Sequence, residues 1–232
     1  MIPAVFGGKT TIRGRRLAAE HVLAMLAELD TPETILDDYA PNPFHGYCTL
    51  ACCKPAIRRT AKKGDWVVGI TSASKGRPQR LVYAVRVDEV LSFAAYWKDR
   101  RFAAKKPEWS PHDKPNTASV GDNCYEPVGR GLPRQIPCRH SRSDGAPNGG
   151  SRRRDLSGKR VLVSWSYSYF GEKGHRLPAG VPIPGIGHRV VNVDTPEARR
   201  IAAVLKGLPR ARHGRPQLFA DEKVRCPRSQ CG

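Results

Sequence analysis

Two groups of polar side chains have the types and spacing for acid–base chemistry. Gly121-Asp122-Asn123-Cys124-Tyr125 brings a carboxylate, an amide and a phenol together between irregular segments, where functional sites often lie. His45 stands in a rigid turn between Pro43 and Gly46. We expect Asp122 and His45 to act as acid or base, with a structural turn as the alternative for the Asp122 segment. The other titratable candidates are Asp65, Asp155 and His140.

The seven cysteines leave three chemistries open. Their odd number and irregular spacing favour reduced thiols over a disulfide framework. Cys48-x3-Cys52 has the spacing of a zinc ligand pair, but the second pair, Cys138-x-His140, is tighter than usual. Cys52 and Cys53 flank the expected start of a helix, where a thiol pKa is lowered, so a reactive thiolate is another possibility. The third is burial as small apolar side chains.

Basic and aromatic side chains are the candidates for nucleic-acid binding. The formal net charge is +19, and most of the excess lies in residues 127–232, which favours a polyanionic partner. Arginines would hold phosphates, Tyr167 or Tyr169 would stack on a base, and Asn123 or Asp122 would bond its edge. The alternative for the tyrosines is a place in the core. The binding candidates are Asn42, Phe44, Lys54, Arg58, Arg59, Asn123, Arg152, Arg153, Arg154, Tyr167 and Tyr169.

Several functional classes lose support from the sequence. It has no phosphate-binding Gly-rich loop, no dinucleotide-binding glycine pattern, no serine-hydrolase elbow and no His-Glu-x-x-His. No apolar run is long enough to cross a bilayer, and the first residues do not form a signal peptide. We expect a cytoplasmic protein that does not act on membranes. The sequence identifies no cofactor and leaves the oligomeric state open.

Four helices and five strands are expected to position these residues. The apolar spacing predicts an amphipathic helix over residues 15–30, and Pro55 opens a short basic helix that Gly64 ends. Further helices are expected over residues 92–98 and 195–206. Strands are expected over residues 34–38, 66–70, 81–87, 161–170 and 189–193.

The pattern predicts an α+β fold with three or four short helices. Its sheet would be mixed or antiparallel, curled or closed into a small barrel. We divide the chain into an N-terminal helical extension (1–33), a main domain (34–220) and a basic tail (221–232). Within the main domain, residues 130–155 are rich in Gly, Pro, Arg and Ser, which predicts a flexible basic loop.

Two blocks of sequence resemble a known family. The first runs from Tyr39-Ala40-Pro41-Asn42-Pro43-Phe44 through Cys52-Cys53-Lys54-Pro55 to Gly64-Asp65-Trp66. The second comprises Leu81 to Leu91, Tyr96-Trp97, Gly121 to Tyr125, and Val161 to Gly171, in that order. They are similar to the second family of nucleotide modification associated domains. The strands near Gly64 and Leu81 are also similar to the barrel core of PUA-like and EVE folds, which hold modified nucleotides.

The resemblance implies work on modified bases in DNA, in phages or bacteria, and it brings no mechanism with it. We therefore expect the protein to bind nucleic acid, DNA ahead of RNA, or nucleotides, and to take part in base modification. A noncatalytic reader of modified bases is the first alternative. A structural or partner-binding protein with a generic basic surface is the second.

Overall fold

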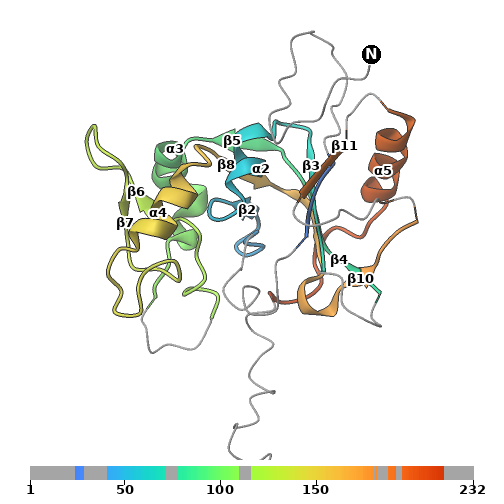
Figure 1. Ribbon diagram of the computed structural model, residues 1–232. Helices are drawn as coiled ribbons and strands as arrows, with labels where there is room; N and C mark the ends of the chain where they lie inside the picture. Colours follow the sequence, from blue (N-terminus) through green and yellow to red (C-terminus); the bar gives the residue numbers. More distant parts are fainter. Residues whose placement is uncertain are drawn as a thin grey trace, which may run out of the picture.

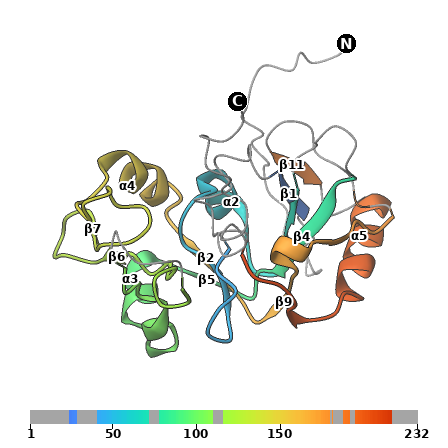
Figure 2. The ribbon, with the colours of Figure 1, turned by 90° about the horizontal axis from the view of Figure 1, so that it is seen from below.

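The structure of the chain, a computed structural model, describes residues 24–28, 41–71, 78–109, 116–179, 181, 188–191 and 195–216. In Figures 1 and 2 the elements form three groups side by side. Helices α3 (Phe93–Lys98) and α4 (Gly149–Leu156) and a small hairpin lie at one end, and a large sheet with helix α5 (Pro196–Lys206) lies at the other. Helix α2 (Pro55–Thr60) and a three-stranded sheet lie between them.

The large sheet is mixed and has seven strands in the described part of the chain. Its order is β11-β1-β3-β4-β9-β12, and β10 also pairs with β4. β1 is parallel to β3 and β12 is parallel to β9, whereas the other pairs are antiparallel. The strands are β1 (Ala24–Glu28), β3 (Trp66–Ile70), β4 (Arg80–Arg86), β9 (Ser166–Tyr169), β10 (His175–Arg176), β11 (His188–Val191) and β12 (Ala211–Arg212).

The three-stranded sheet is joined to the large one at a corner held by Asp88. Its antiparallel order is β2 (Cys48–Leu50), β8 (Val161–Ser164) and β5 (Glu89–Leu91). The chain passes from β8 to β9 through Trp165, which is exposed. The buried Asp88 carboxylate accepts hydrogen bonds from the backbone amides of Trp165 and Ser166 at 2.8 and 2.9 Å. This one side chain therefore fixes the bend between the two sheets.

The remaining elements are short and begin at residues that cap them. The Ser92 and Thr195 side chains cap α3 (Phe93–Lys98) and α5 (Pro196–Lys206), and Asn148 caps α4 (Gly149–Leu156). These side chains satisfy backbone amides that the first helical turn leaves without partners. The others are α2 (Pro55–Thr60), the 3-10 helices η1 (Arg100–Lys105) and η2 (Gly171–Lys173), and the hairpin of β6 (Tyr125–Glu126) and β7 (Arg134–Gln135).

Three apolar clusters hold these groups together. One packs α5 on the large sheet through Ile201 and Leu205, and a second fills the space around β2, β3 and β4. The third contains Phe93, Tyr96 and Phe102 together with buried cysteines. This last cluster supports the end of the molecule that carries α3 and α4.

Most of the expected elements are confirmed, and the α+β class with a mixed sheet is confirmed with them. The expected strands at 66–70 and 81–87 pair as antiparallel neighbours. The helices expected at 54–63, 92–98 and 195–206 form, although the first ends at Thr60. The strand expected over 161–170 is divided at Trp165 into β8 and β9. Among the described residues no helix is long and apolar enough to cross a membrane.

Three expectations need correction. Residues 24–28 form strand β1 and not part of a helix, because hydrogen bonds to β3 and β11 on both sides outweigh the amphipathic pattern. The described strands form open sheets and no closed barrel, so a PUA-like barrel is not confirmed. Residues 149–156, expected within a flexible loop, form α4. The expected strand at 34–38 and the tail at 221–232 lie outside the described residues.

Replacing Gly69 by alanine should destabilise the fold. Gly69 lies opposite Tyr83 in the β3–β4 pair, and a Cβ atom there would fall on the Tyr83 ring. That ring is buried and stacks on Tyr169 at 6.3 Å, so it has little room to move. Overpacking of this kind costs about 1–3 kcal/mol. Urea unfolding should show this loss for Gly69→Ala, and much less for Gly131→Ala, whose added carbon makes only an ordinary contact.

Candidate active site

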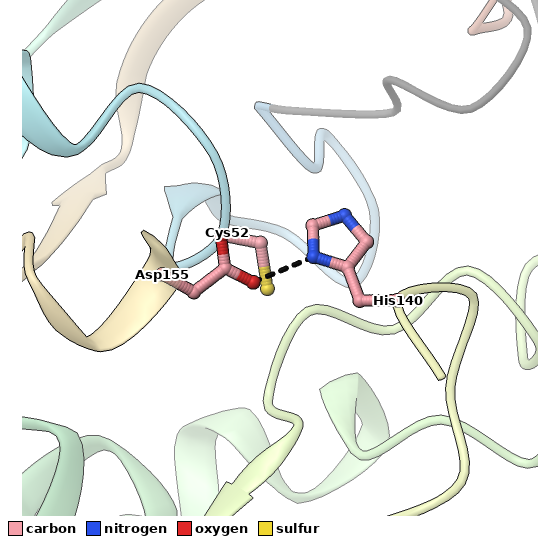
Figure 3. Close-up of side chains that lie close together, drawn as sticks. All are labelled: Cys52, His140 and Asp155. Atoms are coloured by element: carbon pink, nitrogen blue, oxygen red, sulfur yellow. Dashed lines mark hydrogen bonds and ion pairs between the residues drawn. The ribbon is translucent and has the colours of Figure 1, made fainter. Parts of the chain in front are cut away.

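A cysteine, a histidine and a carboxylate from three separate segments meet beside α4. Sγ of Cys53 lies 3.5 Å from Nε2 of His140, and Nδ1 of the same ring lies 2.6 Å from Oδ2 of Asp155. We call these three residues the triad. Figure 3 shows the bonded pair of His140 and Asp155, with Cys52 close to them. Because Cys53 is half-buried while the other two are buried, the thiol is the most accessible member.

Asp155 is a buried acceptor with three donors. Besides His140, its carboxylate accepts hydrogen bonds from the Tyr125 hydroxyl at 2.6 Å and from the Cys53 backbone amide at 2.8 Å. Burial alone raises the pKa of Asp155, but the bonds from His140, Tyr125 and Cys53 outweigh it and lower the pKa. An ionised Asp155 takes its bond from a protonated Nδ1. Nε2 of His140, the other ring nitrogen, is then the one that faces the sulfur of Cys53.

The segments that carry the triad are held by local hydrogen bonds. Asp155 lies on α4, whose start is capped by Asn148. His140 lies in a turn after β7, and Gln135 donates to its backbone carbonyl at 3.1 Å. The same turn is closed by the Ser141 hydroxyl, which accepts from the Cys138 amide at 3.0 Å. The orientation of the imidazole is therefore held by the hydrogen bond of its ring and by the hydrogen bonds to the backbone of its turn.

Cys53 adopts an unusual backbone conformation. Its φ is 54° and that of Lys54 is 40°, both in the left-handed region, directly before Pro55 opens α2. Non-glycine residues occupy this region at a cost, and such positions are often functional. Cys53 is half-buried, whereas the preceding Cys52 is fully buried. Two adjacent cysteines therefore have different surroundings.

The side chain of Arg58 connects two members of the triad by hydrogen bonds to their backbone carbonyls. The side chain is fully buried and donates to the carbonyls of Cys53 at 2.8 Å, Asp155 at 2.6 Å and Arg160 at 2.9 Å. The sequence predicts that Arg58 holds phosphate, whereas its guanidinium is buried here and donates to three backbone carbonyls. Gly158 makes room for it, because a Cβ atom there would overlap the guanidinium.

Three more thiols, those of Cys52, Cys124 and Cys138, form a hydrogen-bonded group near the triad. Cys124 hydrogen-bonds with both Cys52 and Cys138. The bond with Cys124 and the charge of His140 lower the pKa of Cys138 to about 6 against the effect of burial. For Cys52, burial and nearby carboxylates raise the pKa to about 12 despite its bond with Cys124. Cys52 also lies 3.6 Å from the carbonyl oxygen of Asp122, consistent with a thiol that donates.

Cys52, His140 and Asp155 are also a group that could hold a metal ion, since one ligand atom of each lies within 4.8 Å of the others. Of the zinc ligands considered from spacing, Cys48 lies elsewhere, in β2 and in the second apolar cluster. A zinc ligand directs its donor atom at the ion. Nδ1 of His140 is bonded to an oxygen of Asp155, which leaves Nε2 to face either a thiol or, as in many zinc sites, a metal ion.

Asp122, expected as an acid or base, lies in a second buried network. Its carboxylate accepts from the hydroxyls of Thr49 at 2.8 Å and Tyr96 at 2.7 Å. Asn123 is buried as well and donates to the carbonyls of Tyr96 and Phe102. These contacts connect β2, α3 and η1. The geometry favours a structural role for both residues.

The turn from Pro41 to Tyr47 is fastened to the same network by Lys105. This fully buried ammonium donates to the side-chain and backbone oxygens of Asn42 and to the carbonyl of Tyr47, at 2.9–3.1 Å. Asn42 is buried, and so is Phe44, whose ring lies 4.8 Å from the guanidinium of Arg212. His45 is exposed in this turn, and the charge of Lys105 adds to the effect of burial in lowering its pKa.

The predicted phosphate-binding residues have different surroundings. Arg59, Arg153 and Arg154 are exposed, and Lys54 is half-buried. Arg152 donates to the carbonyls of Pro133 and Leu132, so it holds the loop before β7. The exposed arginines therefore lie on α2, which follows Cys53, and on α4, which carries Asp155, and these two helices pack against each other.

The aromatic residues expected near a base are in the core. Tyr167, Tyr169 and Phe170 are all buried. Tyr169 stacks on Tyr83, and the Tyr167 hydroxyl donates to the carbonyl of Pro43 at 3.3 Å. Of the two interpretations left open by the sequence, the core position is the one observed.

The triad combines residues that the sequence analysis considered only singly. Cys53 was a possible thiolate, and His140 and Asp155 were two of five acid–base candidates. Because Cys53 lies far from His140 and Asp155 in the chain, the sequence alone does not show that the three residues meet. The available signals were a cysteine directly before a Lys-Pro helix start and a lone aspartate after three arginines in the segment Arg152–Asp155.

Comparison with known proteins gives two family matches. Residues 35–223 match the family described as nucleotide modification associated domain 2. Residues 1–41 match a family described as a protein of unknown function, DUF433. The search of curated proteins found no match, and the search of solved structures found none.

The buried network predicts how stability depends on pH. Burial lowers the pKa of Lys105 to about 8 from its ordinary value of 10.5, although Asp122 acts in the opposite direction. Between these pH values the unfolded chain binds a proton at Lys105 that the folded chain has lost, so this residue makes the free energy of unfolding rise with pH. Lys105→Met should be less stable than the wild type throughout, by a margin that widens from pH 8 to 10.5 in urea unfolding. A constant or shrinking margin would contradict this, and Lys98→Met, at an exposed site, serves as the control.

Proposed function

Because the chain belongs to the nucleotide modification associated domain 2 family, we propose that it is a nucleotide-modifying enzyme with a cysteine nucleophile. Cys53 attacks the substrate, His140 takes the thiol proton, and Asp155 orients the imidazole and stabilises its charged form. The observation that carries the proposal is the contact of Cys53 with Nε2 of a histidine whose Nδ1 is bonded to a buried carboxylate. A nucleophile, a base and an orienting group in this order are typical of covalent catalysis.

The surroundings of each member suit its role. Asp155 remains ionised through its three hydrogen bonds, and an ionised carboxylate favours the imidazolium that forms when Cys53 loses its proton. Arg58 holds the backbones of Cys53 and Asp155, so the distance between nucleophile and orienting group does not depend on flexible loops. Precise placement of reacting groups is a major source of rate enhancement.

The exposed arginines of α2 and α4 suit a substrate that carries phosphate. Arg59 on α2 and Arg153 and Arg154 on α4 are exposed, and neither helix has an exposed acidic residue. These residues would hold the backbone of a nucleic acid or the phosphate of a nucleotide. We propose DNA ahead of RNA, as the resemblance implies, with a base as the group that becomes modified.

The reactivity of Cys53 tests this proposal. An ordinary thiol with a pKa of about 8.5 is only a few per cent thiolate at neutral pH, so a thiolate paired with an imidazolium should react roughly tenfold faster or more. Full-length protein should therefore be alkylated first at Cys53 by limiting iodoacetamide, as mapped by mass spectrometry. His140→Gln should lower the rate about tenfold.

Two controls keep the alkylation test specific. Cys48→Ala removes a fully buried cysteine of β2 that is not a member of the triad and should leave labelling of Cys53 unchanged. A chelator should also leave it unchanged, because the triad needs no metal. Slow labelling of Cys53 with no effect of His140→Gln would overturn the proposal and favour a noncatalytic reader or a structural protein.

Binding to DNA should depend on the arginines of α4. Neutralising two phosphate contacts lowers the slope of log affinity against log salt by about 1 to 2. The double variant Arg153→Gln/Arg154→Gln should show this change in titrations with a short duplex. The matched control, Arg199→Gln/Arg200→Gln, alters two adjacent exposed arginines of α5, at the opposite end of the molecule (Figure 1). Equal slopes for both double variants would contradict a binding surface at α4.

A further inference from the structure

The triad contains one imidazole that can both take and return a proton at the sulfur of Cys53. Nε2 of His140 lies 3.5 Å from Sγ, and the opposite nitrogen is bonded to Asp155. After the thiol is deprotonated, the proton on Nε2 remains next to the bond that forms at sulfur. The site is therefore suited to a reaction in which the group leaving the attacked carbon needs that proton.

Three classes of thiolate reaction differ in whether they need a proton delivered next to the sulfur. Acyl transfer requires it, because the amine or alcohol that leaves the carbonyl carbon must be protonated. Addition to carbon 6 of a pyrimidine places the next proton on a different ring atom, away from sulfur. Disulfide exchange expels a thiolate and needs an acceptor thiol. Here the nearby thiols of Cys52 and Cys138 are buried and hydrogen-bond with Cys124.

We infer that Cys53 is an acyl carrier: it takes an acyl group from an ester or amide donor as a thioester and passes it to an amine linked to a nucleotide. This inference rests on the proposed function and names its reaction and substrate class. Arg59, Arg153 and Arg154 are exposed on the two helices next to Cys53 and Asp155 and are the groups that would hold the phosphate of the nucleotide.

The two half-reactions balance with His140 as the only proton carrier. In the first, the S–C bond forms, the bond from the carbonyl carbon to the leaving oxygen or nitrogen breaks, and the thiol proton passes through Nε2 to that atom. In the second, the amine nitrogen attacks the thioester carbon, the S–C bond breaks, and the amine proton returns through Nε2 to sulfur. The products are an amide, the free alcohol or amine of the donor, and the original thiol, with no oxidation or reduction.

Acyl turnover can be measured with an activated ester and water as the acceptor. Full-length protein is mixed with p-nitrophenyl acetate, and released nitrophenolate is followed by absorbance. We expect a burst of about one equivalent per chain, an acetyl group on the Cys53 peptide, and then continued release over many equivalents. Cys53→Ser should remove burst and turnover, and His140→Gln should lower the continued release roughly a hundredfold, because general base catalysis by the imidazole is lost.

The positioning role of Asp155 has a readout of its own. Asp155→Asn keeps the size of the side chain but removes the charge that favours the imidazolium. It should lower the continued release while the burst is retained, and circular dichroism shows whether the variant is folded. Cys48→Ala, in β2 and not a member of the triad, should behave as the wild type.

Alkylation and ester turnover, measured together, distinguish a failure of acyl transfer from a failure of the proposed function. Rapid alkylation of Cys53 that depends on His140, with at most one equivalent of nitrophenolate released and no turnover, would overturn acyl transfer and leave the nucleophile in place. A covalent adduct of Cys53 with an oligonucleotide containing 5-fluorocytosine would then show addition to the pyrimidine. If Cys53 reacts slowly with iodoacetamide and the ester alike, both proposals fail.

Discussion

The buried carboxylate of Asp155 is the interaction on which the site depends. A buried charge is tolerated only when hydrogen bonds replace the water it has lost. Asp155 meets this requirement with the Tyr125 hydroxyl, the His140 ring and the Cys53 amide, and its own carbonyl is held by Arg58. These partners come from segments far apart in the chain. Satisfying one charge therefore determines where the cysteine and the histidine stand relative to each other.

A second buried network, around Lys105 and Asp122, organises the neighbouring region in the same way. Lys105 fastens the turn around Asn42, and Asp122 ties β2 to α3 through Thr49 and Tyr96. The adjacent Cys52 and Cys53 connect the two networks, because Cys52 contacts the carbonyl of Asp122 and the Cys53 amide donates to Asp155. Loosening either network should disturb the other through this dipeptide.

Helix α4 separates two electrostatic tasks on two faces. Most side chains of α4 are polar, and three consecutive arginines precede Asp155. Arg153 and Arg154 are exposed while Asp155 is buried, because residues one or two positions apart on a helix point in different directions. One short element thus places positive charge at the surface and the negative charge of the triad inside. The proposed attraction of phosphate and the proposed activation of the thiol are thereby brought to the same place.

The amino-acid sequence by itself determined the α+β class, the central strands, three of the helices and the family. These follow from local signals: β-branched runs such as Trp66–Ile70, caps such as Ser92 and Thr195, and the Asn-Pro-Phe and Cys-Lys-Pro motifs. It also pointed to His140, Asp155 and Cys53 as single candidates. Only the tertiary structure decided that residues 24–28 form a strand, that Arg58 and Tyr169 are buried, and that Cys53, His140 and Asp155 meet. The physical reason is that local patterns record what a residue prefers next to its neighbours in the chain. Burial, and the hydrogen bonds that a buried charge demands, are settled between segments that lie about a hundred residues apart.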